Sequence, residues 1–310
     1  MPTDYAPHLI IAFAQSAGDG WLETVSSLKF KNLDQLLRGM KLADTDAGQA
    51  SSLSPPHERV LAKALELATA DGLIPWAAYE HNAKPNEGWA VVTPCHWAMG
   101  REHATLTDPQ TLDVPEAESR TLLAAMQPYF ATEGITLHYE QPARWLAQGD
   151  VFASLATASL DRVLGRNVDP WLPASKQIKL LQNEMQMLLY THPVNDERAA
   201  KGQRSVNSFW VSGSGALTGA AIANPRVNVN KSLAPSAFAN DWAAYTAAWT
   251  QLDATHIAQL LAQQNSGETV RISLCGESNS VTFESVPRTL FSRLKGAFTP
   301  LSVVYLLKQL

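Results

Sequence analysis

The chain has 310 residues, a formal net charge of −5, and charged side chains at 17% of its positions. This acidic balance and the lack of a basic run argue against a nucleic-acid surface, and no apolar stretch reaches the roughly 18–20 residues that span a bilayer. Two cysteines, Cys95 and Cys275, form neither a disulfide framework nor a C-x-x-C metal site. The N-terminus lacks the basic start of a signal peptide, so we expect a cytoplasmic protein that binds neither nucleic acid nor membrane.

The N-terminal region reads as a strand, a helix and a loop. The apolar run over residues 8–14 is followed by QSAGDG, which is typical of a buried parallel strand entering a loop at its carboxyl end, where α/β proteins bind ligands. Leucines at helical spacing predict a helix over residues 30–40. Residues 43–54 are small and polar, and we expect a mobile loop there. Ser54 is then the expected cap of the next helix.

The middle of the chain mixes both kinds of element. We expect a strand over residues 89–93 and a helix that begins near residue 113 and contains Phe130 on its inner side. Two paired strands follow over residues 135–139 and 143–147, joined by a Gln-Pro turn. Residues 157–176 are irregular in pattern. This order of elements indicates an α+β region.

Residues 183–217, NEMQMLLYTHPVNDERAAKGQRSVNSFWVSGSGAL, combine a helix end, a polar turn and a Gly/Ser-rich loop. The spacing of the apolar residues predicts that most of the helix is buried. The apolar positions are Ile178, Leu180, Leu181, Met185, Met187, Leu188 and Leu189. We expect Pro193 to end the helix, a charged loop over residues 194–203, and a short strand over residues 206–211. The small side chains at 212–215 would let backbone N–H groups approach a ligand, although a tight turn has the same composition.

The C-terminal region returns to the pattern of the start. We expect a helix over residues 241–264, a strand over residues 270–275 that turns at Gly276, and a short amphipathic helix over residues 287–296. Residues 301–307 fit a strand or a helix equally well. The pattern predicts an α/β core sheet flanked by helices, formed by residues 1–43 and 205–310, with an inserted α+β region over residues 44–204.

The central motif, NEMQMLLYTHPVNDERAAKG followed by VNSFWVSGSG, resembles the bacterial RpfE-type regulatory proteins, which are commonly described as phosphoglycerate-mutase-like. Three shorter stretches, TPCH at 93–96, RW at 144–145 and LCGE at 274–277, are similar to the same family. The resemblance runs across nearly the whole chain. It implies a regulatory role.

The order of the elements also resembles the archaeal-type cofactor-independent phosphoglycerate mutases of the alkaline phosphatase superfamily. This resemblance implies an alkaline-phosphatase-like core and, in the relatives, a metal-binding Asp after the first strand and an Asp-His pair after the last. Here Gln15 and Ser16 follow the first strand, with Asp19 three residues later, and Cys275-Gly276-Glu277 follows the last. Two-metal phosphoryl transfer needs several carboxylate and imidazole ligands around two cations. The resemblance therefore implies the fold and weakens the inference to mutase activity.

Three functions remain open. The first is a catalytically degenerate, phosphoglycerate-mutase-like protein that binds a small anionic ligand in a regulatory role, with no metal and no cofactor. The second is an active mutase or phosphatase that uses an altered ligand set such as Asp19, Glu277 and a histidine. The third is a protein-interaction module. The expected ligand-binding residues are Gln15, Ser16, Asp19, Arg198, Asn207, Trp210, Ser212, Gly213, Ser214, Gly215, Cys275 and Glu277.

Several of these residues also have a structural interpretation. Arg198 fits a bidentate grip on a carboxylate or phosphate as well as it fits a network that satisfies carbonyls at a helix end. Cys275 with Glu277 suggests one metal ion, but a buried thiol is the commoner arrangement. Asp19, between two glycines, has the position of a turn residue.

Overall fold

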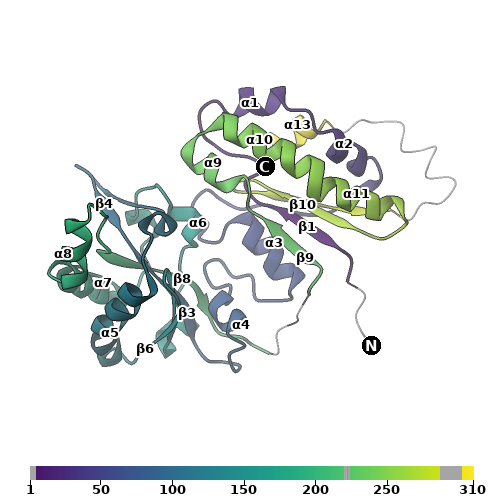
Figure 1. Cartoon of the computed structure of the whole chain (residues 1–310). Helices are drawn as coiled ribbons and strands as arrows, with labels where there is room; N and C mark the ends of the chain where they lie inside the picture. Colours follow the sequence, from purple (N-terminus) through teal and green to yellow (C-terminus); the bar gives the residue numbers. More distant parts are fainter. Residues whose placement is uncertain (1–4, 220–221, 223, 287–301) are drawn as a thin grey trace. The chain divides into compact units, whose positions relative to one another are not determined.

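The computed structural model describes residues 5–219, 222, 224–286 and 302–310. The chain forms two compact units, each described here by itself. The α/β unit comprises residues 1–51, 55–65 and 223–310, and the inserted unit comprises residues 52–54 and 66–222. Figure 1 shows both units as ribbons coloured along the sequence.

The α/β unit is built on a five-stranded sheet with the order β2-β11-β10-β1-β9. The strands are β1 (His8–Ile11), β2 (Met40–Asp46), β9 (Val227–Asn230), β10 (Arg271–Cys275) and β11 (Ser280–Ser285). Strand β1 pairs in parallel with both β9 and β10, whereas β11 is antiparallel to both β10 and β2. Consequently β1, β2, β9 and β10 all point the same way, and their carboxyl ends share one edge of the sheet.

Helices cover both faces of this sheet because its inner strands β1 and β10 are buried on both sides. The helices are α1 (Trp21–Ser27), α2 (Lys31–Leu37), α3 (Pro56–Ala64), α9 (Ala234–Ala239), α10 (Trp242–Leu252), α11 (Ala258–Asn265) and α13 (Val303–Leu307). Leu9 and Ile11 face the large core against α2, α10 and α11, while Ile10 packs with Val60 of α3. In Figure 1, α10 and α11 lie along one face and α3 lies on the other.

The inserted unit has an antiparallel four-stranded sheet with the order β6-β7-β3-β8. Its strands are β3 (Trp89–Cys95), β6 (Thr136–Gln141), β7 (Arg144–Gln148) and β8 (Ser208–Gly215), with a separate hairpin of β4 (Trp97–Met99) and β5 (Ala104–Leu106). The helices are α4 (Trp76–Glu80), α5 (Glu116–Thr132), α6 (Leu160–Val163), α7 (Lys176–Tyr190) and α8 (Pro193–Ala200). Helices α5 and α7 pack on one face with Val92, and α4 packs on the other with Val91.

The expected α/β class, with a sheet flanked by helices and an α+β region in the middle of the chain, is confirmed. The expected boundaries after residues 43 and 204 differ from the observed division. Residues 205–222 belong to the inserted unit because β8 pairs along β3. Strand β2 and helix α3 belong to the α/β unit, because β2 pairs with β11 and α3 packs against β1.

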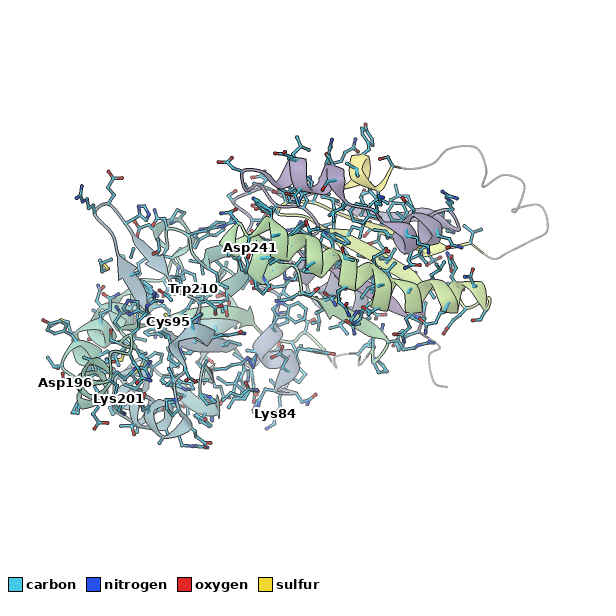
Figure 2. All side chains as sticks on the ribbon, turned by 45° about the horizontal axis from the view of Figure 1, so that its top comes forward. Lys84, Cys95, Asp196, Lys201, Trp210 and Asp241 are labelled. Atoms are coloured by element: carbon cyan, nitrogen blue, oxygen red, sulfur yellow. The ribbon has the colours of Figure 1, made fainter. Side chains whose placement is uncertain are left out.

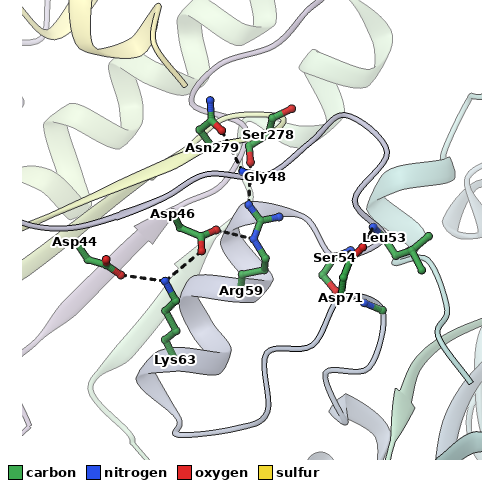
Figure 3. Close-up of polar contacts among 11 residues, drawn as sticks. Asp44, Asp46, Gly48, Leu53, Ser54, Arg59, Lys63, Asp71, Ser278 and Asn279 are labelled. Atoms are coloured by element: carbon green, nitrogen blue, oxygen red, sulfur yellow. Dashed lines mark hydrogen bonds and ion pairs between the residues drawn. The ribbon is translucent and has the colours of Figure 1, made fainter. Parts of the chain in front are cut away.

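Part of the expected mobile loop over residues 43–54 is strand. Strand β2 continues to Asp46 and pairs with β11 at the edge of the sheet. An edge strand exposes much of its surface, so its residues are mostly polar and its sequence resembles that of a loop. Ser54 is not the cap of α3, whose N-cap is Pro55. Instead, within the inserted unit, Ser54 Oγ accepts a hydrogen bond from Gly72 N–H (2.9 Å), while the Asp71 carboxylate accepts from the N–H of Ser54 (2.8 Å) (Figure 3).

The expectation for α7 was also wrong in part. Leu180, Met187 and Tyr190 are 51%, 77% and 85% exposed, so α7 buries one stripe rather than most of its surface. The helix ends at Tyr190, before Pro193, which instead begins α8. Proline suits the first turn of a helix because that turn needs no N–H donor, and the expected charged loop is mostly helix.

The other outcomes concern the C-terminal region. Strand β11 had not been expected, and residues 303–307 are helical. The helix expected over residues 287–296 lies outside the described residues. Within the ranges that the structure describes, no helix has the length and apolar character that crossing a bilayer requires.

His8 gives the α/β unit a testable acid sensitivity. Its Nε2 lies 2.8 Å from Ser273 Oγ inside the sheet, and burial, reinforced by the charge of Arg271, lowers the pKa of His8 to about 4. Between about pH 6.5 and pH 4 the unfolded chain therefore binds a proton that the folded chain does not. Stability falls with decreasing pH there by about 1.4 kcal/mol per pH unit. We expect His8→Gln to remove this slope in urea unfolding followed by tryptophan fluorescence.

The exposed His256 provides the matched control. His256→Gln should leave the acid dependence of the unfolding free energy unchanged. Equal slopes in the wild type and the His8→Gln protein between pH 6.5 and pH 4 would contradict a buried, neutral His8.

Candidate functional site

The carboxyl edge of the α/β sheet is where proteins of this class bind ligands. Two chain segments with sequence-predicted site residues meet there, the one after β1 and the one after β10. Ala14 N–H donates to Cys275 O at 2.8 Å, which ties the segments together directly after their strands. The structure therefore brings Gln15, Cys275 and Glu277 together at this edge of the sheet.

Gln15 and Glu277 form a reciprocal cross-link across this edge. Glu277 N–H donates to Gln15 Oε1 at 3.1 Å, and Ala17 N–H donates to Glu277 Oε1 at 2.9 Å. A carboxylate that accepts a backbone N–H makes a charge-assisted bond, which is among the stronger hydrogen bonds. The side chains that follow the two strands thus bind the protein's own backbone.

The loop after β1 is fixed further by contacts from α10. Tyr245 Oη lies 2.8 Å from Phe13 O, and Trp21 Nε1 donates to Tyr245 Oη at 3.3 Å. Burial raises the pKa of Tyr245 to about 12, so its hydroxyl remains a donor at neutral pH. Phe13 is held at a φ of 58°, in the left-handed region that a bulky residue rarely adopts. The backbone conformation of Phe13 and the hydrogen bond to Tyr245 therefore fix the direction in which the chain leaves β1.

Ser16 and Asp19 have local roles in the same loop. Ser16 is buried, and its Oγ accepts from Gly18 N–H at 3.2 Å. Asp19 is exposed, and its carbonyl accepts from Trp242 Nε1 at 2.7 Å. A Cβ on Gly18 would lie 2.2 Å from Asn240 Oδ1 and 2.8 Å from Trp242 Cζ2, so a larger residue here would require these two side chains to move. These contacts agree with the turn interpretation of Asp19.

A second polar cluster at this edge was missed from the sequence. Asp46, at the carboxyl end of β2, accepts from Arg59 Nε at 2.6 Å and from Lys63 Nζ at 3.1 Å. Lys63 also donates to Asp44 at 3.1 Å, and Arg59 donates to Ser278 O at 2.8 Å (Figure 3). The D-x-D pattern of Asp44 and Asp46 was the available signal.

Cys275 completes the buried part of this edge. It is fully buried, and burial raises the pKa of its thiol well above the usual range. Neither a thiolate ligand nor a thiolate nucleophile is favoured in such a site. The structural interpretation of Cys275, a buried thiol, is the one that fits these surroundings.

The cation pair implied by the resemblance to phosphoglycerate mutases does not fit these residues. Gln15, Glu277 and Asp46 all direct side-chain oxygens at donors of the protein itself. Taken alone, the described part of the α/β unit contains no three His, Cys, Asp or Glu side chains close enough to share an ion. We therefore derive no metal-dependent step for this edge.

The Gly/Ser-rich segment belongs to the inserted unit, and it is strand rather than loop. Residues 212–215 form the end of β8, paired with β3. A Cβ on Gly215 would lie 2.9 Å from Pro75 Cβ, and one on Gly213 would lie 3.1 Å from Trp76 Cβ. The glycines therefore allow the segment that leads into α4 to pack closely on the strand. The expected loop that cradles an anion is not formed.

The polar residues around this strand form hydrogen bonds with other residues of the inserted unit. Ser214 is buried and its Oγ lies 2.7 Å from Thr157 Oγ1. Asn207 Oδ1 accepts from Trp97 N–H at 2.7 Å, and Trp210 Nε1 donates to Ala158 O at 3.0 Å. Figure 2 marks Trp210 and the buried Cys95 in this unit. Ser212, on β8, is partly buried.

Arg198 holds three chain segments together in the inserted unit. Its side chain is fully buried, and Nη1 donates to Glu118 at 2.7 Å while Nε donates to Arg204 O at 2.7 Å. Nη2 donates to Leu112 O. Of the two interpretations from the sequence, this geometry is that of a network satisfying carbonyls.

The comparisons with known proteins add limited information. No protein-family model matches the chain, and no curated protein matches it. Among solved structures it is similar to the cofactor-independent phosphoglycerate mutase from Thermoplasma acidophilum DSM 1728, with 12% identity over 98% of this chain and 99% of that chain and a TM-score of 0.36.

A protein from Pyrococcus horikoshii is similar at 11% identity, over 90% of this chain and 87% of that chain, with a TM-score of 0.39. Both TM-scores are below 0.5, so this likeness by itself decides neither fold nor activity. The RpfE-type resemblance has no counterpart in these comparisons and stays a prediction.

The Arg198 network can be tested by substitution. Arg198→Met removes the buried guanidinium and leaves Glu118 and two carbonyls without their donor. We expect the unfolding free energy to fall by about 3 kcal/mol or more, because such partners are costly to bury alone. Thermal unfolding monitored by circular dichroism would measure the change.

Lys201→Met is the control, since Lys201 is exposed and reaches the same glutamate at 4.0 Å. An exposed ion pair contributes little, so this change should alter stability by less than about 1 kcal/mol. Similar losses in both variants would contradict the role assigned to Arg198.

Proposed function

We propose that this protein is a non-catalytic relative of the phosphoglycerate-mutase-like proteins that acts in a regulatory role by binding a small anionic ligand. The observation that carries the proposal is the Gln15–Glu277 cross-link. It occupies the carboxyl edge of the sheet with internal hydrogen bonds, at the positions where the resemblance places metal ligands in the relatives.

The Asp46 cluster supports the same proposal. Freeing Asp46 for a cation would break its bonds to Arg59 and Lys63 and leave two positive side chains beside the cation. Like charges at such short range disfavour binding. The edge therefore disfavours a catalytic cation, which supports a non-catalytic role.

The proposal predicts no phosphoester turnover. We expect no phosphoglycerate mutase activity and no release of phosphate from p-nitrophenyl phosphate above background, with Mg²⁺, Mn²⁺ or Zn²⁺ present. Glu277→Gln is the matched variant, because it keeps the side-chain size and removes the charge. Residual activity shared equally by both proteins would come from a contaminant. Turnover by the wild type that Glu277→Gln abolishes would overturn the proposal and favour the altered metal site.

A second candidate function rests on the exposed face of α7. Leu180, Met187 and Tyr190 recur at spacings of seven and three, so they share one side of the helix. Exposed apolar stripes of this kind mark interaction sites. Helix α7 begins with the exposed Lys176. The next helix, α8, carries the exposed Asp196, and Figure 2 labels Asp196.

A positive charge at one end of α7 and a negative charge beyond the other end are complementary to those of a second copy of the chain. Two α7 helices in antiparallel pairing would place the basic start of each near the acidic segment of the other, as an isologous interface requires. We therefore propose self-association through α7 as the form that a protein-interaction role takes here.

Met187 and Met99 allow a matched test, being 77% and 79% exposed in the same unit. We expect sedimentation velocity to show a concentration-dependent dimer of the wild type, at least tenfold weaker in Met187→Glu and unchanged in Met99→Glu. A monomer at all concentrations, or equal effects of the two changes, would refute pairing through α7.

A further inference from the structure

A cavity opens in the α/β unit at the amino ends of β1 and β9, opposite the carboxyl edge described above. Its volume is about 250 Å³. Pro7 and Pro225 lie where the two strands begin, Leu9 and Leu260 supply apolar surface, and all lining residues belong to this unit. Small-ligand sites combine apolar walls with a few convergent polar groups. The polar groups of this cavity come from two elements.

The first element is the helix formed by α10, a π-helical turn over Asp253–Ile257, and α11. The turn is held by a contact from α2, because Asn32 Nδ2 donates to Asp253 O at 2.9 Å. The Asp253 carboxylate accepts from Leu33 N–H at 2.9 Å, which anchors the turn to the start of α2. The carbonyl of Asp253 is therefore engaged away from the regular helical ladder. Such π-turns occur frequently at functional sites.

The extra residue of the π-turn rotates the helix that follows it by roughly 100° relative to α10. His256, Gln259 and Gln263, at spacings of three and four, lie on one stripe of this helix and line the cavity. Asn228 of β9 lines it from the sheet. Asn228 and Gln259 are exposed and Gln263 is partly buried, so their carboxamides can reach a ligand in the cavity.

Arg226 brings one guanidinium to the cavity wall, and its charge is balanced in part by Glu268. Arg226 is one of the lining residues, and an ion pair with Glu268, which is not among them, fixes its position. None of the described residues that line the cavity is acidic. His8 contributes no charge at neutral pH because burial lowers its pKa to about 4. The wall therefore offers one guanidinium and several carboxamides, which together select a ligand with an anionic group and hydroxyl groups.

We infer that this cavity is the binding site for a small hydroxylated organic anion, either a carboxylate or a phosphate ester. The guanidinium of Arg226 holds the anionic group, and the carboxamides of Gln259, Gln263 and Asn228 bind the hydroxyl groups. The inference deepens the proposed function, on whose regulatory binding role it rests, by giving the ligand a location away from the carboxyl edge. A ligand here contacts β1, β9 and α11 at once.

The test is a titration of the full chain with malate, glycerol 3-phosphate and, as a neutral control, glycerol. Side-chain amide signals in ¹H–¹⁵N spectra report binding directly. We expect malate or glycerol 3-phosphate to shift the signals of Gln259 and Gln263, and glycerol to leave them in place. The anion that shifts them identifies the source as a carboxylate or a phosphate ester.

Substitutions localise the site. Gln259→Leu and Gln263→Leu keep a helix-forming residue and remove one hydrogen-bonding group, so each should weaken binding about tenfold. Gln251→Leu, at an exposed position on α10 outside the cavity, should leave the affinity unchanged. No shift with either anion at millimolar concentration, or equal effects of all three substitutions, would overturn the inference. Because no turnover is measured, this result is independent of the phosphoester assay.

Discussion

The hydrogen bonds between Gln15 and the segment after β10 determine what the α/β unit can do. Parallel strands bring their carboxyl ends to one edge, and in this class of fold that edge normally remains open to a ligand. Here the Glu277 carboxylate accepts a hydrogen bond from the N–H of Ala17, and Gln15 Oε1 accepts one from the N–H of Glu277. The same fold geometry that would build a site instead builds a cross-link between two strands.

Other features of the α/β unit agree with a rigid, closed edge. Asp46, Arg59 and Lys63 join β2 to α3, and Tyr245 fixes the loop after β1 from α10. Cys275 is buried as a neutral thiol. The polar cavity lies at the opposite edge, where the π-turn reorients α11. With the carboxyl edge closed by internal hydrogen bonds, the opposite edge of the sheet is the one left open for the proposed ligand.

The sequence predicted much of the fold because its signals were local. The apolar runs of β1, β3 and β10 and the periodicity of α5 and α10 identify buried elements directly. Strand β2 was harder to predict, since an exposed edge strand has few apolar residues. Strand β11 lies between β2 and β10 and is largely buried, but only Val281 and Phe283 in it are apolar. The exposed stripe of α7 was misjudged because Met187 and Leu180 count as core by residue type. Burial of such residues depends on what packs against the helix.

The candidate site was predicted less well than the fold. Gln15 and Glu277 lie together because parallel strands share an edge, whereas residues 212–215, expected to bind the same ligand, belong to the inserted unit. The glycines at 213 and 215 were taken for a ligand loop, and their close approach to Pro75 and Trp76 could not be read from local composition. The π-turn depends on a contact between Asn32 and Asp253, which are far apart in sequence. Such long-range causes leave no periodic signal.

The most direct measurement is anomalous diffraction from crystals of the full chain soaked in Mn²⁺. An edge closed by Gln15 and Glu277 predicts no anomalous peak beside these two residues or beside Asp46. Two peaks separated by roughly 3.5–4 Å at that edge, the spacing of a two-metal centre, would contradict the account.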